Sequence, residues 1–161
     1  MKKKDMALIT ANIAAVAILM NVFSIPLISP EPGTKITEIR PEFVWGGLAG
    51  HAVLYLDDDP DFRSPVEWEI DGHSFRPDKP LGFGTYYWKV NGRNGLESLP
   101  STFTVVSEVS VSRTGDMIVN TGNTNIFVSA VERNGMVTGM VLGINQSTDI
   151  RREENVTAWQ L

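Results

Sequence analysis

The stretch Gly84-Thr85-Tyr86-Tyr87-Trp88-Lys89-Val90 decides the fold, because it predicts a β-strand that begins at a glycine turn. Aromatic and β-branched residues are enriched in strands, and successive side chains of a strand point to opposite faces. One face therefore carries Tyr86, Trp88 and Val90, and the other carries Tyr87 and Lys89. Because an unpaired lysine is costly to bury, we expect the face of Trp88 to form the core of an all-β domain.

Further short strands are expected on both sides of this stretch. They lie at 42–45, 52–57, 66–70, 73–75 and 101–106. Several are separated by turns that contain glycine, and short strands with such turns at regular spacing predict a β-sandwich. Phe43 and Trp45 share one face of the first of these strands. We therefore expect this pair to point into the same core as Trp88.

The order of these residues resembles the fibronectin type III domain, more narrowly the version found in bacterial and archaeal surface proteins. The matching pieces are Pro30-x-Pro32-Gly33, Pro41-x-Phe43-x-Trp45, Tyr55-Leu56-Asp57 followed by Asp61-Phe62, Leu81-x-x-Gly84-Thr85-Tyr86-Tyr87-Trp88-x-Val90 and Phe103-x-Val105. The resemblance covers residues 30–106. It implies a seven-stranded Greek-key sandwich in which Trp45 packs on the strand of Trp88, and a role in binding or spacing without catalytic residues. The family has a corner tyrosine six residues after a leucine, and this spacing selects Tyr87 after Leu81. The alternation of side chains selects Tyr86 instead, so both residues stay candidates.

Residues 107–161 predict a second, smaller β domain. Ile126–Glu132 and Met136–Leu142, joined through Asn134-Gly135, form the strongest hairpin signal in the chain. The turn Asn120-Thr121-Gly122-Asn123 resembles one in the repeated β-sandwich domains of archaeal and bacterial surface proteins.

The segment Met6–Ile28 contains no charged residue and predicts one N-terminal transmembrane helix. At ~1.5 Å per residue it would span roughly 34 Å, which is enough for the hydrocarbon core of a bilayer. The preceding Lys2, Lys3 and Lys4 place the N-terminus in the cytoplasm by the positive-inside rule, with the β domains outside. The expected division is therefore a basic start with an anchor (1–29), a fibronectin type III-like domain (30–106) and a small β-strand domain (107–161).

Two other interpretations of the N-terminus stay open. A cleaved signal peptide has the same basic start, but its apolar region is usually about 7–15 residues, and there is no clear small-x-small cleavage site just before Pro30. A prepilin-type leader cut before Met6 or Ala7 would make the chain a pilus-like filament subunit. No glutamate lies near the fifth position of that processed helix, which weakens the match to pilins.

The composition excludes several chemistries. The chain has 161 residues and no cysteine, so disulfides, thiolate metal sites and cysteine nucleophiles are excluded. The first five residues carry a formal +2, which leaves −7 for the rest of a chain whose total charge is −5. This acidic exterior argues against nucleic acid as a partner, and it fits a cationic partner, metal ions or simple solubility.

One acidic cluster is a candidate metal site. Its carboxylates are Asp57, Asp58, Asp59 and Asp61. Such oxygen ligands suit calcium, but the spacing is not that of an EF-hand loop, which needs a glycine at the sixth place and a glutamate at the twelfth. The family resemblance puts this run in a loop between strands, where Asp and Pro make turns. We therefore expect no cofactor, and calcium at this loop is the one alternative that stays open.

No catalytic constellation is visible, so we expect a protein that is not an enzyme. His51 and His73 have no histidine or cysteine at ligand spacing. Glu67 and Glu69 alternate with Trp68 on one strand, which places both carboxylates on one face. We expect that face to be solvated and not to form a glycosidase pair, with Trp68 directed into the core.

Three residues are candidates for contacts outside the fold. Trp159 is the interface candidate, because an exposed aromatic side chain can contact a protein or stack on a sugar. Asn145-Gln146-Ser147 and Asn155-Val156-Thr157 match the acceptor pattern for N-glycosylation, which fits the expected location outside the membrane.

Together these features predict a single-pass membrane protein with an interaction or structural module at the cell surface. Other surface proteins, or copies of the same chain, are the expected partners. The absence of cysteine from an extracytoplasmic domain favours an archaeal or bacterial source. A filament subunit and a carbohydrate-binding surface protein are the alternatives.

Overall fold

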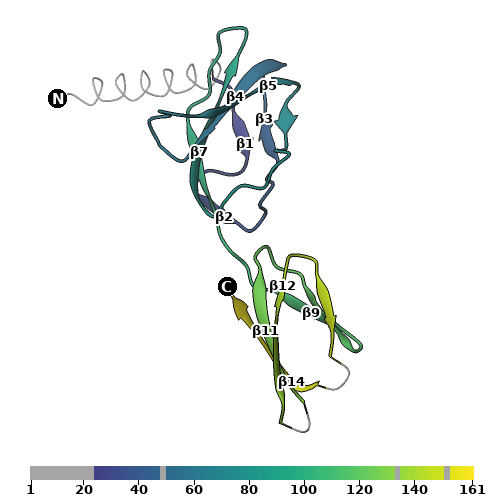
Figure 1. Ribbon diagram of the computed structural model, residues 1–161. Helices are drawn as coiled ribbons and strands as arrows, with labels where there is room; N and C mark the ends of the chain where they lie inside the picture. Colours follow the sequence, from purple (N-terminus) through teal and green to yellow (C-terminus); the bar gives the residue numbers. More distant parts are fainter. Residues whose placement is uncertain (1–23, 48–49, 133–134, 151–152) are drawn as a thin grey trace, which may run out of the picture. The chain divides into compact units, whose positions relative to one another are not determined.

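The computed structural model describes residues 24–47, 50–132, 135–150 and 153–161 of the chain. The regular elements of this part are the strands β1 to β14 (Figure 1), so the predicted all-β class is confirmed. The strands form two compact units. Unit 1 contains residues 24–36 and Arg40–Val105, and unit 2 contains Thr37–Ile39 and Val106–Leu161.

The larger sheet of unit 1 has the strand order β2-β8-β7-β4-β5. Its strands are β2 (Thr34–Ile36), β4 (His51–Asp57), β5 (Val66–Asp71), β7 (Gly84–Gly92) and β8 (Ser101–Val105). Neighbouring strands are antiparallel, except that β2 runs parallel to β8. The stretch that contains Trp88 therefore lies in the central strand, with β8 on one side and β4 on the other.

The smaller sheet of unit 1 has the order β1-β3-β6. Its antiparallel strands are β1 (Leu27–Ser29), β3 (Phe43–Trp45) and β6 (Ser74–Phe75). The chain changes sheet on entering and on leaving β2, and again between β3 and β4, between β5 and β6, and between β6 and β7. This pairing confirms the seven-stranded sandwich that the fibronectin type III resemblance implies, with β2 as an added short edge strand.

The predicted inward face of β7 is confirmed. Trp88 is fully buried, and the ring of Phe43 from the other sheet meets it edge-on with the ring centroids 5.0 Å apart. Phe103 of β8 lies 5.8 Å from Phe43. Edge-to-face contacts of this kind add to the free energy gained by burying the rings. Lys89 lies on the opposite face, with its Nζ 4.9 Å from the ring centroid of Phe62.

Tyr86 is the corner tyrosine, as alternation predicts. Its hydroxyl donates a hydrogen bond of 3.1 Å to the carbonyl oxygen of Gly82, four residues upstream. Its ring stacks on Phe103 at 5.7 Å. Burial raises the pKa of the Tyr86 hydroxyl, and the charge of Asp58 acts in the same direction. The hydroxyl therefore stays protonated and fixes the loop before β7.

The predicted end of the N-terminal helix is wrong. Ser24 forms an isolated bridge with Glu97, Ile25 is buried in the core of unit 1, and β1 begins at Leu27. Pro26 explains this end, since proline is poorly tolerated inside a helix. Residues 6–23 of the predicted Met6–Ile28 span lie outside the described residues. Among the described residues, no helix is long and apolar enough to cross a membrane.

Unit 2 consists of two three-stranded sheets, with the orders β13-β10-β9 and β12-β11-β14. Its strands are β9 (Val111–Thr114), β10 (Met117–Asn120), β11 (Ile126–Glu132), β12 (Val137–Leu142), β13 (Ser147–Asp149) and β14 (Glu153–Gln160). The predicted hairpin is confirmed, because β11 pairs antiparallel with β12. The core contains Ile118, Ile126, Val128, Leu142 and Ile150.

The turn at 120–123 holds unit 2 together through two asparagine side chains. Asn120 is fully buried, and its Nδ2 donates to the carbonyl oxygens of Thr124 (2.8 Å) and Leu142 (3.2 Å). Nδ2 of Asn123 donates to the carbonyl oxygens of Thr37 (2.6 Å) and Val106 (2.8 Å). The bond from Asn123 to Thr37 connects the short segment Thr37–Ile39 to the rest of unit 2.

Candidate interaction surfaces

The sheet β12-β11-β14 of unit 2 has one face on the core and one face on solvent. Along β11, Ile126, Val128 and Ala130 are buried, so Phe127 and the residues that alternate with it point outward. The strand register brings nine outward positions together. They are Phe127, Ser129 and Val131 of β11, Val137, Gly139 and Val141 of β12, and Asn155, Thr157 and Trp159 of β14. We call this surface the aromatic face.

The aromatic face carries no charged side chain at these nine positions, although a fifth of the chain is charged. Val141, Phe127 and Trp159 are cross-strand neighbours in one row, and the rings of Phe127 and Trp159 are 5.0 Å apart. Val141 is 54% exposed and Trp159 46% exposed. Contiguous exposed apolar side chains of this kind mark sites of contact with another molecule.

Gly139 determines how the centre of the aromatic face is filled. A Cβ atom at this position would overlap the ring of Phe127, so the ring lies over the glycine backbone. Absence of a side chain on one strand thus lets a large ring from the next strand lie close to the sheet. The sequence predicted Trp159 as a contact residue, but it did not identify Phe127 or the two valines of β12. Their common face depends on the register of three separate strands.

The two glycosylation candidates occupy different places in unit 2. Asn145 lies in the turn between β12 and β13 with a φ of 61°, and its side chain is exposed. Asn155 is exposed on the aromatic face, opposite Val131 of β11. A glycan on Asn155 would therefore extend from the same face as Trp159. Modification of either asparagine stays a prediction.

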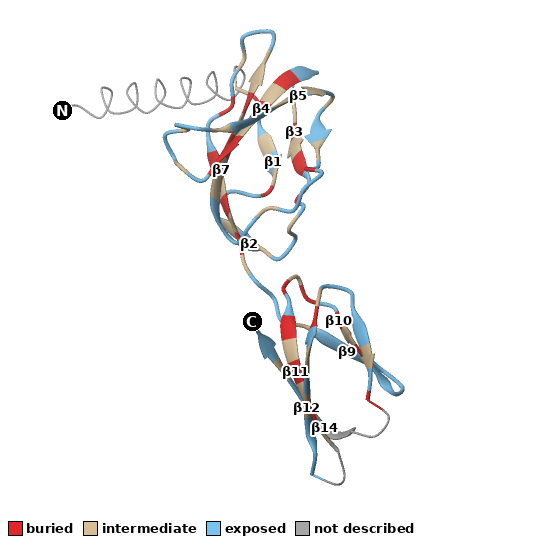
Figure 2. Cartoon of the chain, in the orientation of Figure 1, coloured by how far each residue is buried: buried red, intermediate tan, exposed pale blue. Residues whose placement is uncertain are grey.

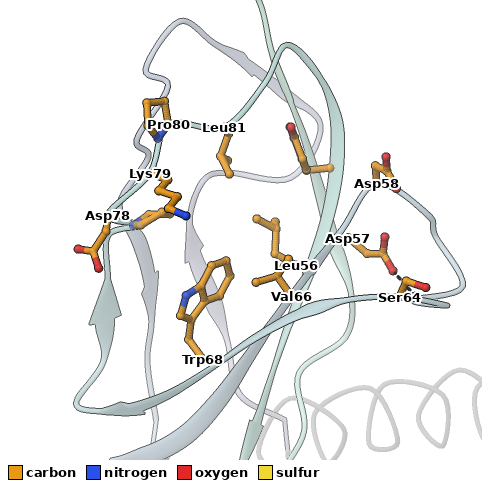
Figure 3. Close-up of a pocket in the computed structure, with 12 residues that line it drawn as sticks. Leu56, Asp57, Asp58, Ser64, Val66, Trp68, Asp78, Lys79, Pro80 and Leu81 are labelled. Carbon is orange, nitrogen blue, oxygen red and sulfur yellow. Dashed lines mark hydrogen bonds between the residues drawn. The ribbon is translucent and has the colours of Figure 1, made fainter.

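Unit 1 has a cavity of about 580 Å³ along the edge strand β5 (Figure 3). Apolar side chains form its middle, and polar side chains stand on both sides of them. The apolar residues are Leu56, Val66, Trp68 and Leu81, and the charged ones are Asp57, Asp58, Asp78 and Lys79. A mixed lining around an apolar centre is typical of ligand pockets.

Trp68 forms one wall of this cavity and does not fill the core completely. It pairs with Leu54 across β4 and β5, which gives it the inward direction that alternation predicts. Its ring lies 4.9 Å from Phe75, and the side chain is only half-buried. Strand β6, which carries Phe75, is two residues long, so the smaller sheet leaves this part of β5 partly open.

The acidic cluster at 57–61 forms a closed turn. The buried carboxylate of Asp57 accepts hydrogen bonds from the backbone nitrogens of Asp59 (3.2 Å) and Ser64 (3.0 Å). Arg63 lies 3.3 Å from Asp59 Oδ2 and 2.7 Å from Asp61 Oδ2. Within the described part of the chain, no three acidic or histidine side chains converge as metal ligands. Calcium binding by Asp57, Asp58, Asp59 and Asp61 stays a prediction.

The remaining predicted residues make ordinary surface contacts. His51 Nδ1 contacts Asp71 Oδ1 on the exposed end of the β4–β5 pair, and His73 is exposed. Glu67 and Glu69 share the exposed outer face of β5, as predicted, and Glu69 accepts a hydrogen bond of 2.9 Å from Arg93.

No protein-family model matches this sequence, and no curated protein sequence matches it. Solved structures with low similarity include the FN1–FN3 domains of chicken CNTN1, at 10% identity over 85% of this chain and 55% of that chain, with a TM-score of 0.35. A segment of two fibronectin type III domains from chicken tenascin has 17% identity over 85% of this chain and 81% of that one, with a TM-score of 0.34. The BSP domain of a biofilm-associated protein has 18% identity over 82% of this chain and 26% of that one, with a TM-score of 0.34. This chain thus spans about half the length of the first of these chains.

Proposed function

We propose that this chain is a non-enzymatic interaction module, displayed outside a cell membrane, that binds another protein through the aromatic face of unit 2. The observation that carries the proposal is the uncharged outer face of β12-β11-β14, with exposed Val141 and Trp159 beside Phe127. Figure 2 shows exposed residues along β12 and β14 in pale blue. Exposed side chains of a solvated sheet are ordinarily polar or charged, whereas aromatic residues are enriched at protein interfaces.

The sequence supports the membrane location. Residues 6–23 contain no charge and follow three lysines. At ~1.5 Å per residue, a helix over residues 6–23 would span about 27 Å. This length is still close to the thickness of the hydrocarbon core of a bilayer. The positive-inside rule then places both units outside.

Site-specific photo-crosslinking in the native membrane tests the proposal. A photoreactive phenylalanine analogue replaces Trp159 in the full chain, and the matched control replaces Met117, which is 44% exposed on the other sheet of unit 2. We expect a protein adduct from position 159 and none from position 117. Equal adducts from both positions, or none from either, would contradict the proposal. An adduct with a second copy would identify self-assembly.

Carbohydrate binding is the second candidate, because the exposed Trp159 ring beside Phe127 is also a platform on which a sugar ring can stack. Tryptophan fluorescence titrated with a panel of glycans distinguishes it from protein binding. A saturable change that is lost in Trp159→Ala would favour carbohydrate, and unchanged emission across the panel would exclude it for the glycans used.

A further inference from the structure

Strand β5 ends the five-stranded sheet of unit 1 and leaves one edge open. It pairs with β4 along Val66–Asp71, and no other strand of the described part pairs with its second edge. An open edge presents unpaired backbone N–H and C=O groups, which can hydrogen-bond an added strand.

The cavity beside β5 would receive the side chains of such a strand. Val66 and Trp68 of β5 line it, and Val66 is 54% exposed. Residues of an added strand that alternate inward would point toward the same space. Its volume of about 580 Å³ can hold large apolar side chains. Figure 3 shows Leu56, Val66 and Trp68 together in the middle of the space, with Asp58 on one side and Asp78 on the other.

The charges of β5 define what kind of strand can bind. Its outward residues Glu67 and Glu69 are both exposed, and Glu69 already accepts a hydrogen bond from the guanidinium of Arg93. Opposite charges on neighbouring strands stabilise pairing, and like charges directly opposite each other destabilise it. A second copy of β5 would bring glutamates against glutamates, whereas Lys or Arg at the outward positions would meet carboxylates.

We propose that the open edge of β5 binds an extended segment of a partner protein in which apolar residues alternate with Lys or Arg. The apolar side chains enter the cavity over Trp68, and the basic side chains pair with Glu67 and Glu69. This inference rests on the proposed function as an interaction module, and it names the chemistry of a partner at a second surface, on unit 1.

The test uses the full chain in a neutral detergent and a ten-residue peptide that alternates Lys and Val. Isothermal titration, corrected with empty micelles, should show saturable one-to-one binding. Two further peptides carry N-methyl groups on one or the other alternate set of amides. Only the set that faces β5 donates hydrogen bonds to it, so one methylated peptide should bind at least about tenfold more weakly and the other should bind like the parent.

Charge variants test the second half of the proposal. Glu67→Lys combined with Glu69→Lys should weaken binding about tenfold. Glu31→Lys combined with Glu42→Lys changes the net charge of unit 1 equally and should leave binding unchanged. Equal weakening by both pairs, equal effects of both methylated peptides, or no saturable binding of the parent peptide would overturn the assignment.

The peptide-binding test of the β5 site can fail independently of the crosslinking test of the aromatic face. Crosslinks from position 159 with no peptide binding at β5 would leave the interaction module in place and reject the β5 site. Peptide binding at β5 without crosslinks from position 159 would support the β5 site and reject binding through the aromatic face.

Discussion

Trp88 is the residue whose removal should cost unit 1 the most. It is fully buried at the centre of β7 and contacts Phe43 of the opposite sheet. Truncating a buried tryptophan leaves a cavity, so we expect Trp88→Ala to lower the free energy of unfolding by about 3–5 kcal/mol in urea denaturation. Leu99→Ala, at a residue that is 79% exposed, is the control and should change it little. A Trp88→Ala variant that unfolds like the wild type would show that the inward face of β7 is wrongly assigned.

Asp57 should make unit 1 sensitive to acid. Burial raises the pKa of its carboxyl, but the backbone N–H donors of Ser64, Asp59 and Asp58 outweigh burial and lower the pKa below its ordinary value. A carboxyl with a lowered folded pKa stabilises the fold above its unfolded pKa of about 3.9. That contribution is lost as the pH falls through the folded value.

Urea midpoints of the wild type and of Asp57→Asn at a series of pH values check this. The variant should be less stable at pH 7, and the difference should shrink as the pH falls below about 4. Asp61→Asn, at an exposed carboxylate of the same loop, is the control. A difference between wild type and Asp57→Asn that stays constant from pH 7 to pH 3 would show that the Asp57 charge plays no part.

Single side chains were predictable where alternation alone decides them. Lys89 fixed the orientation of Trp88. The same argument favoured Tyr86 as the corner residue, but the distance from Leu81 favoured Tyr87, and the structure decides for Tyr86. Alternation also gave Trp68 its correct inward direction. Alternation could not show that Trp68 is covered only in part, because its cover depends on β6, which pairs with β3 in the other sheet and is only two residues long.

At the scale of elements, the turn 120–123 is the feature that unit 2 depends on most. Gly122 is packed so closely against the backbone that a Cβ atom there would overlap the carbonyl oxygen of Glu108. Backbone cannot move aside as a flexible side chain can. We therefore expect Gly122→Ala to destabilise unit 2 by about 1–3 kcal/mol or more while unit 1 is unaffected.

Hydrogen exchange of the two units, followed by mass spectrometry, measures this separately for each unit. Gly143→Ala is a matched control in unit 2, because its Cβ atom would meet side-chain atoms of Gln146 and Asn125 and no backbone atom. Faster exchange in β10 and β11 of Gly122→Ala, with unchanged exchange in β7, is the expected result. Equal protection of β11 in both alanine variants would contradict the role of the turn.

Elements were predictable to different degrees for a physical reason. The hairpin of β11 and β12 has strong alternation around a glycine turn, and it formed as expected. Strand β1 was missed because Ile25, Leu27 and Ile28 continue an apolar run, and such a run suits a helix as well as a buried strand. Pro26 was the available signal that the helix ends earlier.

At the scale of the whole molecule, the position of β1 leads to a test of where the folded part begins. A fragment of residues 24–161 retains Ile25 and the pairing of β1 with β3. A fragment of residues 30–161 loses both. Removing a buried isoleucine alone costs about 2–5 kcal/mol, and the loss of β1 also exposes an edge of β3.

We therefore expect unit 1 to unfold cooperatively without detergent in residues 24–161, and to be several kcal/mol less stable in urea in residues 30–161. Ile25→Ala in the longer fragment isolates the side-chain contribution and should fall between the two. If residues 6–23 are the anchor, the full chain should fractionate with membranes and need detergent, whereas residues 24–161 should need neither. Equal stability of the two fragments would show that β1 does not contribute to the sandwich. A full chain that stays in solution without detergent would show that residues 6–23 are not a membrane anchor.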